Sequence, residues 1–108
     1  MIAKTPKPPY YAVIFTSIRR DGAPGYAEMA EKMLGLASKQ SGFLGAESAR
    51  ESLGITVSYW ESLESIRQWK SNIDHQFAQQ SGREFWYSAY KTRVSKVERD
   101  YEFEFNDN

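Results

Sequence analysis

The chain of 108 residues contains no cysteine, a single histidine and no excess of charge of either sign. Without cysteine there is no disulfide framework, no thiol nucleophile and no cysteine-based metal site. Fourteen basic residues balance fourteen acidic ones, so no overall field attracts the chain to nucleic acid or to an acidic membrane surface. We therefore expect no nucleic-acid partner and no membrane partner, and the absence of cysteine fits a reducing cytoplasm.

Long apolar runs are also missing. No segment approaches the roughly 18 apolar residues that a membrane span requires, and Met1–Pro9 lacks the apolar core of a signal peptide. The glycines match neither a phosphate-binding loop nor a dinucleotide fingerprint. The acidic residues have only one distant histidine to join them, so we expect no bound metal. These observations predict a cytoplasmic protein of one domain.

The order of the expected elements is strand, helix, strand, strand, helix, strand. The strands are expected over 10–18, 43–51, 55–61 and 88–100, and the helices follow Gly25 and Ser62, with Ser62 as N-cap. Ser41–Gly42 and Ser81–Gly82 are expected to end the helices, and Asn72 is a point where the second one could be interrupted. This order predicts an α+β, ferredoxin-like βαββαβ sandwich with a four-stranded antiparallel sheet.

The two ends of the chain differ in composition from the centre. Three prolines, Pro6, Pro8 and Pro9, predict a flexible N-terminal arm over 1–9, ahead of a domain at 10–101 and a C-terminal tail at 102–108. Two helices on one face of a sheet leave the other face open. The large side chains of the strands fit two covered faces better than one, so we expect a homodimer formed through the open sheet face.

Aromatic residues make up 15% of the chain and supply most of the candidate site residues. An apolar slot for a small aromatic ligand is predicted from Phe15, Tyr59, Trp60, Trp69, Phe77 and Trp86. Candidate hydrogen-bond donors in it are Thr16, Ser17, Tyr59, Trp69 and His75, with Trp69 and His75 as the catalytic pair. The alternative is that these aromatic side chains fill the core and His75 lies at the surface. On an uninterrupted helix, His75 would point well away from Trp69.

The chain resembles the antibiotic biosynthesis monooxygenase family of dimeric α+β barrel proteins. The resemblance rests on the aromatic strand Tyr10–Phe15, the turn Ser41–Gly45, the strand-to-helix run Ser58–Ser62 leading to Trp69, and the segment Trp86–Tyr90. It covers about residues 10–100. It implies a homodimer whose two sheets form a barrel, with a pocket between sheet and helices in each protomer. It also implies oxidation of polycyclic aromatic compounds without metal or flavin. The first hypothesis is therefore a monooxygenase that acts on a small aromatic or quinol substrate, with His75 as proton acceptor.

A haem-degrading branch of the same superfamily gives a second hypothesis. That branch pairs a pocket tryptophan and a histidine ligand with an asparagine on the first strand. Trp69 matches the tryptophan, but Thr16 or Ser17 stands near the asparagine position, and the family histidine would lie nearer Gln79 than His75. A third hypothesis is a non-catalytic dimer that binds a small hydrophobic molecule. Because fold does not fix function, all three remain open at this point.

Overall fold

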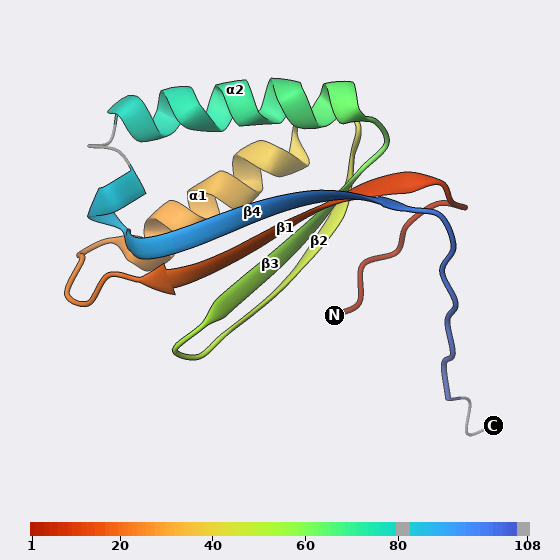
Figure 1. The fold of residues 1–108 in the computed structure, drawn as a ribbon, viewed down its shortest axis with the longest axis horizontal. Helices are drawn as coiled ribbons and strands as arrows, with labels where there is room; N and C mark the ends of the chain where they lie inside the picture. The colour runs from red at the N-terminus through yellow and green to blue at the C-terminus, as the bar shows by residue number, and fades with distance from the viewer. Residues whose placement is uncertain (80–82, 106–108) are drawn as a thin grey trace.

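The computed structural model describes residues 1–79 and 83–105. The elements are the strands β1 (Tyr10–Arg19), β2 (Phe43–Arg50), β3 (Gly54–Trp60) and β4 (Tyr87–Val97), the helices α1 (Tyr26–Ser38) and α2 (Leu63–Gln79), and the short 3₁₀ turn η1 (Arg83–Phe85). The strands form one antiparallel sheet in the order β2-β3-β1-β4. Both helices lie on the same side of this sheet (Figure 1). The predicted ferredoxin-like βαββαβ fold is confirmed.

The register of the strands assigns each side chain to one face of the sheet. In β1, Tyr11, Val13, Phe15 and Ser17 share one face, because side chains alternate along a strand. Tyr11 is paired with Trp60, which is fully buried and belongs to the cluster that includes Ile66 of α2, so this is the helix-facing side. Residues at the even positions of β1 therefore lie on the opposite, open face.

The helix-facing core consists of two separate clusters. One gathers Met29, Met33, Phe77 and Trp86, with Tyr26 and Ile73 packed at its edge. The other gathers Ala37, Trp60 and Ile66, with Val13, Phe43 and Trp69 packed against it. Burial of these apolar side chains supplies most of the driving force for helix–sheet packing.

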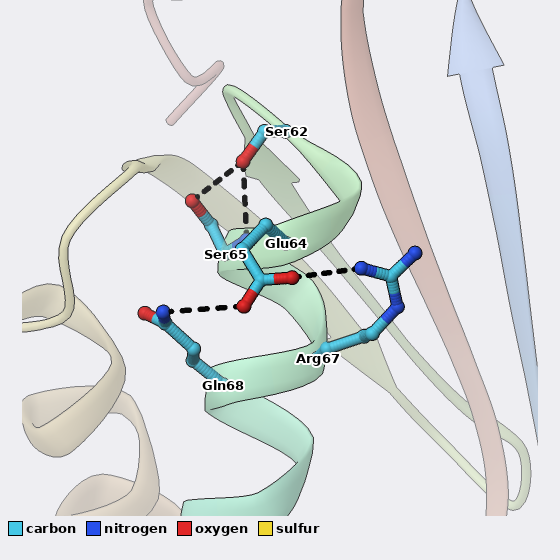
Figure 2. Close-up of polar contacts among 5 residues, drawn as sticks. All are labelled: Ser62, Glu64, Ser65, Arg67 and Gln68. Atoms are coloured by element: carbon cyan, nitrogen blue, oxygen red, sulfur yellow. Dashed lines mark hydrogen bonds and ion pairs between the residues drawn. The ribbon is translucent and has the colours of Figure 1, made fainter.

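The start of α2 is fixed by side-chain capping (Figure 2). The Ser65 amide donates a 3.1 Å hydrogen bond to Ser62 Oγ, and the two serine hydroxyls lie 2.9 Å apart. Arg67 and Gln68 then hold the Glu64 carboxylate, with the Arg67 ion pair at 2.8 Å. Ser62 is therefore the N-cap that the sequence predicts. An acidic residue in the first turn also complements the helix dipole.

Several boundaries differ from expectation. Helix α1 ends at Ser38, before the predicted Ser41–Gly42 stop, and β4 ends at Val97 rather than near residue 100. Helix α2 runs unbroken past Asn72, so the interruption allowed for there does not occur. The predicted stop at Ser81–Gly82 lies outside the described residues. Local propensity fixes where an element lies but leaves its ends open by a few residues.

The two ends of the chain meet over the open face of the sheet, near Tyr10. Thr5 Oγ1 donates to the Tyr10 hydroxyl at 2.9 Å, and Tyr10 donates to Asp100 at 2.5 Å. Beyond this point the C-terminal segment runs away from the body of the molecule (Figure 1). Its aromatic residues Tyr101, Phe103 and Phe105 are 77–86% exposed. Within the described part of the chain, neither helix has the length and apolar content needed to cross a membrane.

Candidate functional site

Two stacked tryptophans form the first wall of the candidate site. The ring centres of Trp60 and Trp69 lie 6.1 Å apart, with the ring planes at 24° to each other. The Phe43 ring packs edge-on against Trp60, with 5.3 Å between the ring centres. The Trp60 indole donates a 2.9 Å hydrogen bond to Ser58, so its polar atom is satisfied within the sheet. Trp69 is only partly buried. The sequence placed both residues at the site, and the structure brings them into contact.

A second group of aromatic rings lies further along the same face of the sheet. The centre of the Phe15 ring lies 5.3 Å from that of Tyr87 and 5.5 Å from that of Tyr90. The ring centres of Tyr87 and Tyr26 of α1 lie 5.7 Å apart. Tyr90 is 46% exposed, so this group borders solvent on the β4 side. These rings give a second wall with geometries that aromatic pairs prefer.

A single row of residues crosses all four strands beside this second wall. Arg50 is paired with Gly54, Gly54 with Ser17, and Ser17 with Tyr90. Because Gly54 has no side chain, Arg50 crosses over β3 and its Nη2 donates to Ser17 Oγ. A Cβ atom at Gly54 would overlap the Arg50 guanidinium. Ser17, which the sequence predicts as a donor, therefore lies at the helix-facing side and is 2% exposed.

Thr16 and Tyr59 lie on the other face. Strand alternation places both on the open side of the sheet, away from Trp60 and the helices. They therefore do not line the space between the sheet and helices in which the sequence grouped them. Tyr59 donates a 2.6 Å hydrogen bond to Glu47, and its ring meets that of Tyr10 edge-on at 5.9 Å.

The predicted residues of α2 and its following segment are divided by burial. Phe77 and Trp86 are buried in the cluster with Met29 and Met33, so they act as core side chains. His75 is exposed, because α2 continues without a kink and turns this position away from Trp69. Among residues 1–79 and 83–105, His, Cys, Asp and Glu side chains form no group of three that could hold a metal ion.

Sequence reasoning missed Arg50 and Tyr26. The Arg50 guanidinium carbon lies 5.3 Å from the centre of the Tyr26 ring, a cation–π contact between β2 and α1. The sequence shows that Arg50 and Gly54 are close together on either side of a hairpin turn. Only the register of the hairpin shows that they are paired, so that a long cationic side chain lies opposite a residue without one.

A ferredoxin-like sheet with two helices on one face and an aromatic-walled site defines a class of small α+β proteins. Residues 9–81 match the family described as antibiotic biosynthesis monooxygenase, and the chain belongs to this family. A relative from Bacillus subtilis (strain 168), the uncharacterized protein YqjZ, is 50% identical over 109 residues, covering 99% of this chain and 96% of YqjZ.

Two solved structures show the same fold. SnoaB of Streptomyces nogalater, described as a cofactor-independent oxygenase, superposes with a TM-score of 0.67 at 10% identity, covering 84% of this chain and 95% of SnoaB. PA3566 of Pseudomonas aeruginosa gives a TM-score of 0.66 at 14% identity, covering 89% of this chain and 99% of that one. At these identities the likeness concerns the fold.

Proposed function

We propose that the protein is a cofactor-independent monooxygenase that acts on a small aromatic or quinol substrate between the sheet and the helices. The observation that carries the proposal is the Trp60–Trp69 pair, whose partly buried outer ring offers a flat apolar surface on the helix-facing side. Membership of the monooxygenase family and the shared fold with SnoaB support it.

The reaction requires few functional groups from the protein. The substrate loses two hydrogens from one carbon and gains one oxygen atom of O2, and the second oxygen atom leaves as water. The electrons come from the substrate, so the protein supplies a dry cavity, orientation and donors that stabilise the substrate anion. In this chain the Trp69 indole is the candidate donor at this surface, whereas Ser17 Oγ accepts a hydrogen bond from Arg50 further along β1.

The proposed reaction does not involve haem. His75, the one histidine, lies on the exposed side of α2, and no contact of the described residues favours a haem site over an aromatic substrate site. The proposal gives His75 no part as proton acceptor, because its side chain is exposed, and the cytoplasmic location remains a prediction from the sequence.

We also propose that two copies of the chain associate through the open face of the sheet. Ile14 and Val57 are paired on this face, and Ile18 and Ile55 are 46% and 42% exposed. Apolar side chains gathered on one sheet face are a typical interaction surface. A second copy of the same chain would cover this face without blocking the helix-facing site.

Oxygen uptake by purified, chelator-treated protein tests the proposed activity. The substrates are a panel of aromatic quinols and anthrones, and the matched variants are Trp69→Ala and Arg67→Ala on the same helix. We expect protein-dependent uptake that falls about tenfold or more in kcat/KM for Trp69→Ala and stays unchanged for Arg67→Ala, whose side chain is exposed. Equal uptake with and without protein across the panel would contradict the proposal.

A further inference from the structure

The Arg50 guanidinium is a cation held between the sheet and α1 without a counterion. Its Nη2 donates to Ser17, but its Nη1 is buried and has no hydrogen-bond partner. In the described part of the chain, the ion pairs join Arg67 to Glu64 and Lys70 to Asp74, and none involves Arg50. A buried donor without an acceptor is costly, and a buried charge without a partner is more so.

The surroundings of Arg50 add positive charge. The Arg19 guanidinium carbon lies 5.3 Å from the centre of the Tyr26 ring, the same distance as that of Arg50. Two cations therefore share one phenol ring, and Arg19 makes no ion pair among the described residues either. This local excess of positive charge stands out in a chain whose net charge is zero.

A second unsatisfied donor lies in the same neighbourhood. The Trp86 indole nitrogen is buried without a partner, and Trp86 packs in the cluster that Tyr26 adjoins. Its ring lies beside Gly25, the residue before Tyr26. Natural proteins leave few buried polar atoms unpaired, so the unpaired Arg50 and Trp86 donors mark this end of the helix-facing side as unusual.

The glycine opposite Arg50 shows that this arrangement is built into the sheet. Arg50 reaches Ser17 only because Gly54 leaves its place on the sheet empty, and any side chain there would collide with the guanidinium. A shallow cavity of about 210 Å³ lies at the same end of the sheet, but Thr16, Ile18, Ala89 and Lys91 in its lining belong to the open face, so it lies across the sheet from Arg50. Tyr90, which packs on Phe15 on the helix-facing side, is 46% exposed, so this group of rings reaches solvent.

We propose that Arg50 is the anchor of a binding site for an aromatic anion. The ligand places an oxyanion, either an ionised hydroxyl or a carboxylate, against the Arg50 guanidinium, and its ring lies among Phe15, Tyr26 and Tyr90. Guanidinium groups suit this task because they offer paired N–H donors to oxyanions and also stack on rings. This site is separate from the Trp60–Trp69 pair, because Trp60 is paired with Tyr11 and Arg50 contacts Ser17, further along the same strand.

Calorimetric titration with matched probes tests the inference. The probes are the hydroxynaphthoquinone lawsone, which is ionised near neutral pH, its neutral methyl ether, and naphthoate as the carboxylate counterpart. We expect the wild-type protein to bind at least one of the two anions about tenfold or more tightly than the ether, a ratio that corresponds to about 1.4 kcal/mol. Comparison of lawsone with naphthoate identifies which oxyanion the site prefers.

Three variants assign the selectivity to Arg50. Arg50→Met is expected to remove the preference for the anion and to leave the affinity for the ether within about twofold. Arg50→Lys is expected to restore part of the preference, because it keeps the charge but loses the paired donors. Arg67→Met, which removes an exposed arginine of α2, is the control and is expected to keep the full preference.

The inference is overturned if the wild-type protein binds the anions and the ether equally, or if Arg50→Met keeps the preference. It is also overturned if Arg50→Met weakens all probes alike, since that would be a structural effect. If Arg50→Met does not fold, the ratio of the wild-type affinities for the anions and for the ether is the deciding measurement. Because binding is measured without turnover, anion selectivity in a protein that consumes no oxygen would reject the proposed function and retain the Arg50 site.

Discussion

Tyr59 of β3 donates a 2.6 Å hydrogen bond to Glu47 of β2, on the face of the sheet that the helices leave uncovered. The backbone amide of Ala3 donates to the same carboxylate at 2.8 Å, which ties the N-terminal arm to the sheet. The hydrogen bond from Tyr59, followed by that from Ala3, holds the pKa of Glu47 below its ordinary value of 4.5. Burial, and then the bond to Glu47, raises the pKa of Tyr59 to about 12.

We expect Tyr59→Phe to lower the stability of the protein by about 1 kcal/mol near pH 7. Since the pKa of Glu47 is lower in the folded state, its contribution is fully present above pH 4.5 and is lost as the pH falls through the folded value. Tyr59 itself contributes fully below pH 10.0, and its contribution is lost as the pH rises through about 12. The difference between wild type and variant should therefore shrink in acid and in strong alkali.

Denaturant unfolding across this pH range measures the difference. Tyr101→Phe is the control, because the Tyr101 side chain is 85% exposed, and it should follow the wild type throughout. A constant gap between wild type and Tyr59→Phe from pH 3 to pH 8, an interval of about five pH units that spans the ordinary carboxylate range, would show that Glu47 is not the partner that matters.

Association through the open sheet face makes a second prediction. Val57→Lys introduces a charge next to Ile14 in the centre of that face, so it should weaken self-association by about tenfold or more. Leu34→Lys, at a residue of α1 that is 52% exposed, places the same charge on the other side of the molecule and should have no effect. Sedimentation over a range of concentrations distinguishes them, and a wild-type protein that stays monomeric throughout would reject the dimer.

A third prediction concerns two glycines with opposite requirements. Gly42 has a φ of +86°, and a Cβ atom there would collide with Ser65 at the capped start of α2. Gly42→Ala should therefore cost about 2 kcal/mol or more. Gly35 lies within α1, where an added Cβ meets nothing within 4 Å. Gly35→Ala should instead stabilise the protein by about 0.5–1 kcal/mol. Thermal unfolding of both variants checks this, and two changes of the same sign would contradict it.

The fourth prediction is that His75 is not required for activity. His75 is exposed on α2, so His75→Ala should retain at least about half of the wild-type kcat/KM for oxygen uptake. Hemin titration should give the same absorbance change for wild type and His75→Ala. A Soret band that disappears in the variant would instead make His75 a haem ligand and revive the haem hypothesis.

Much of the fold could be predicted from local pattern. The aromatic and β-branched run at Tyr10–Ile18 predicts β1, and the apolar stripe that contains Met29 and Met33 predicts α1. Ser62 predicts the start of α2, and its hydroxyl does cap that helix. These features depend on neighbours in the sequence, so they can be recognised without three-dimensional information.

The candidate site was only partly predictable. Trp60 and Trp69 lie against each other because a strand and the helix after it bring them together, and their role in a site stays a prediction. Thr16 and Tyr59 were grouped with them although strand alternation directs both to the open face. Aromatic content identifies side chains suited to a wall, but does not reveal which of them meet and which fill the core, as Phe77 and Trp86 do.

The sequence by itself determined the order of the elements, the capped start of α2 and the family to which the chain belongs. Only the tertiary structure decided that Arg50 crosses Gly54 to reach Ser17 and lies against Tyr26. The reason is physical. Helix and strand signals repeat over a few residues, whereas the Arg50 contacts join residues of β1, β2 and α1 that lie far apart in the chain and become neighbours only when the sheet takes its register.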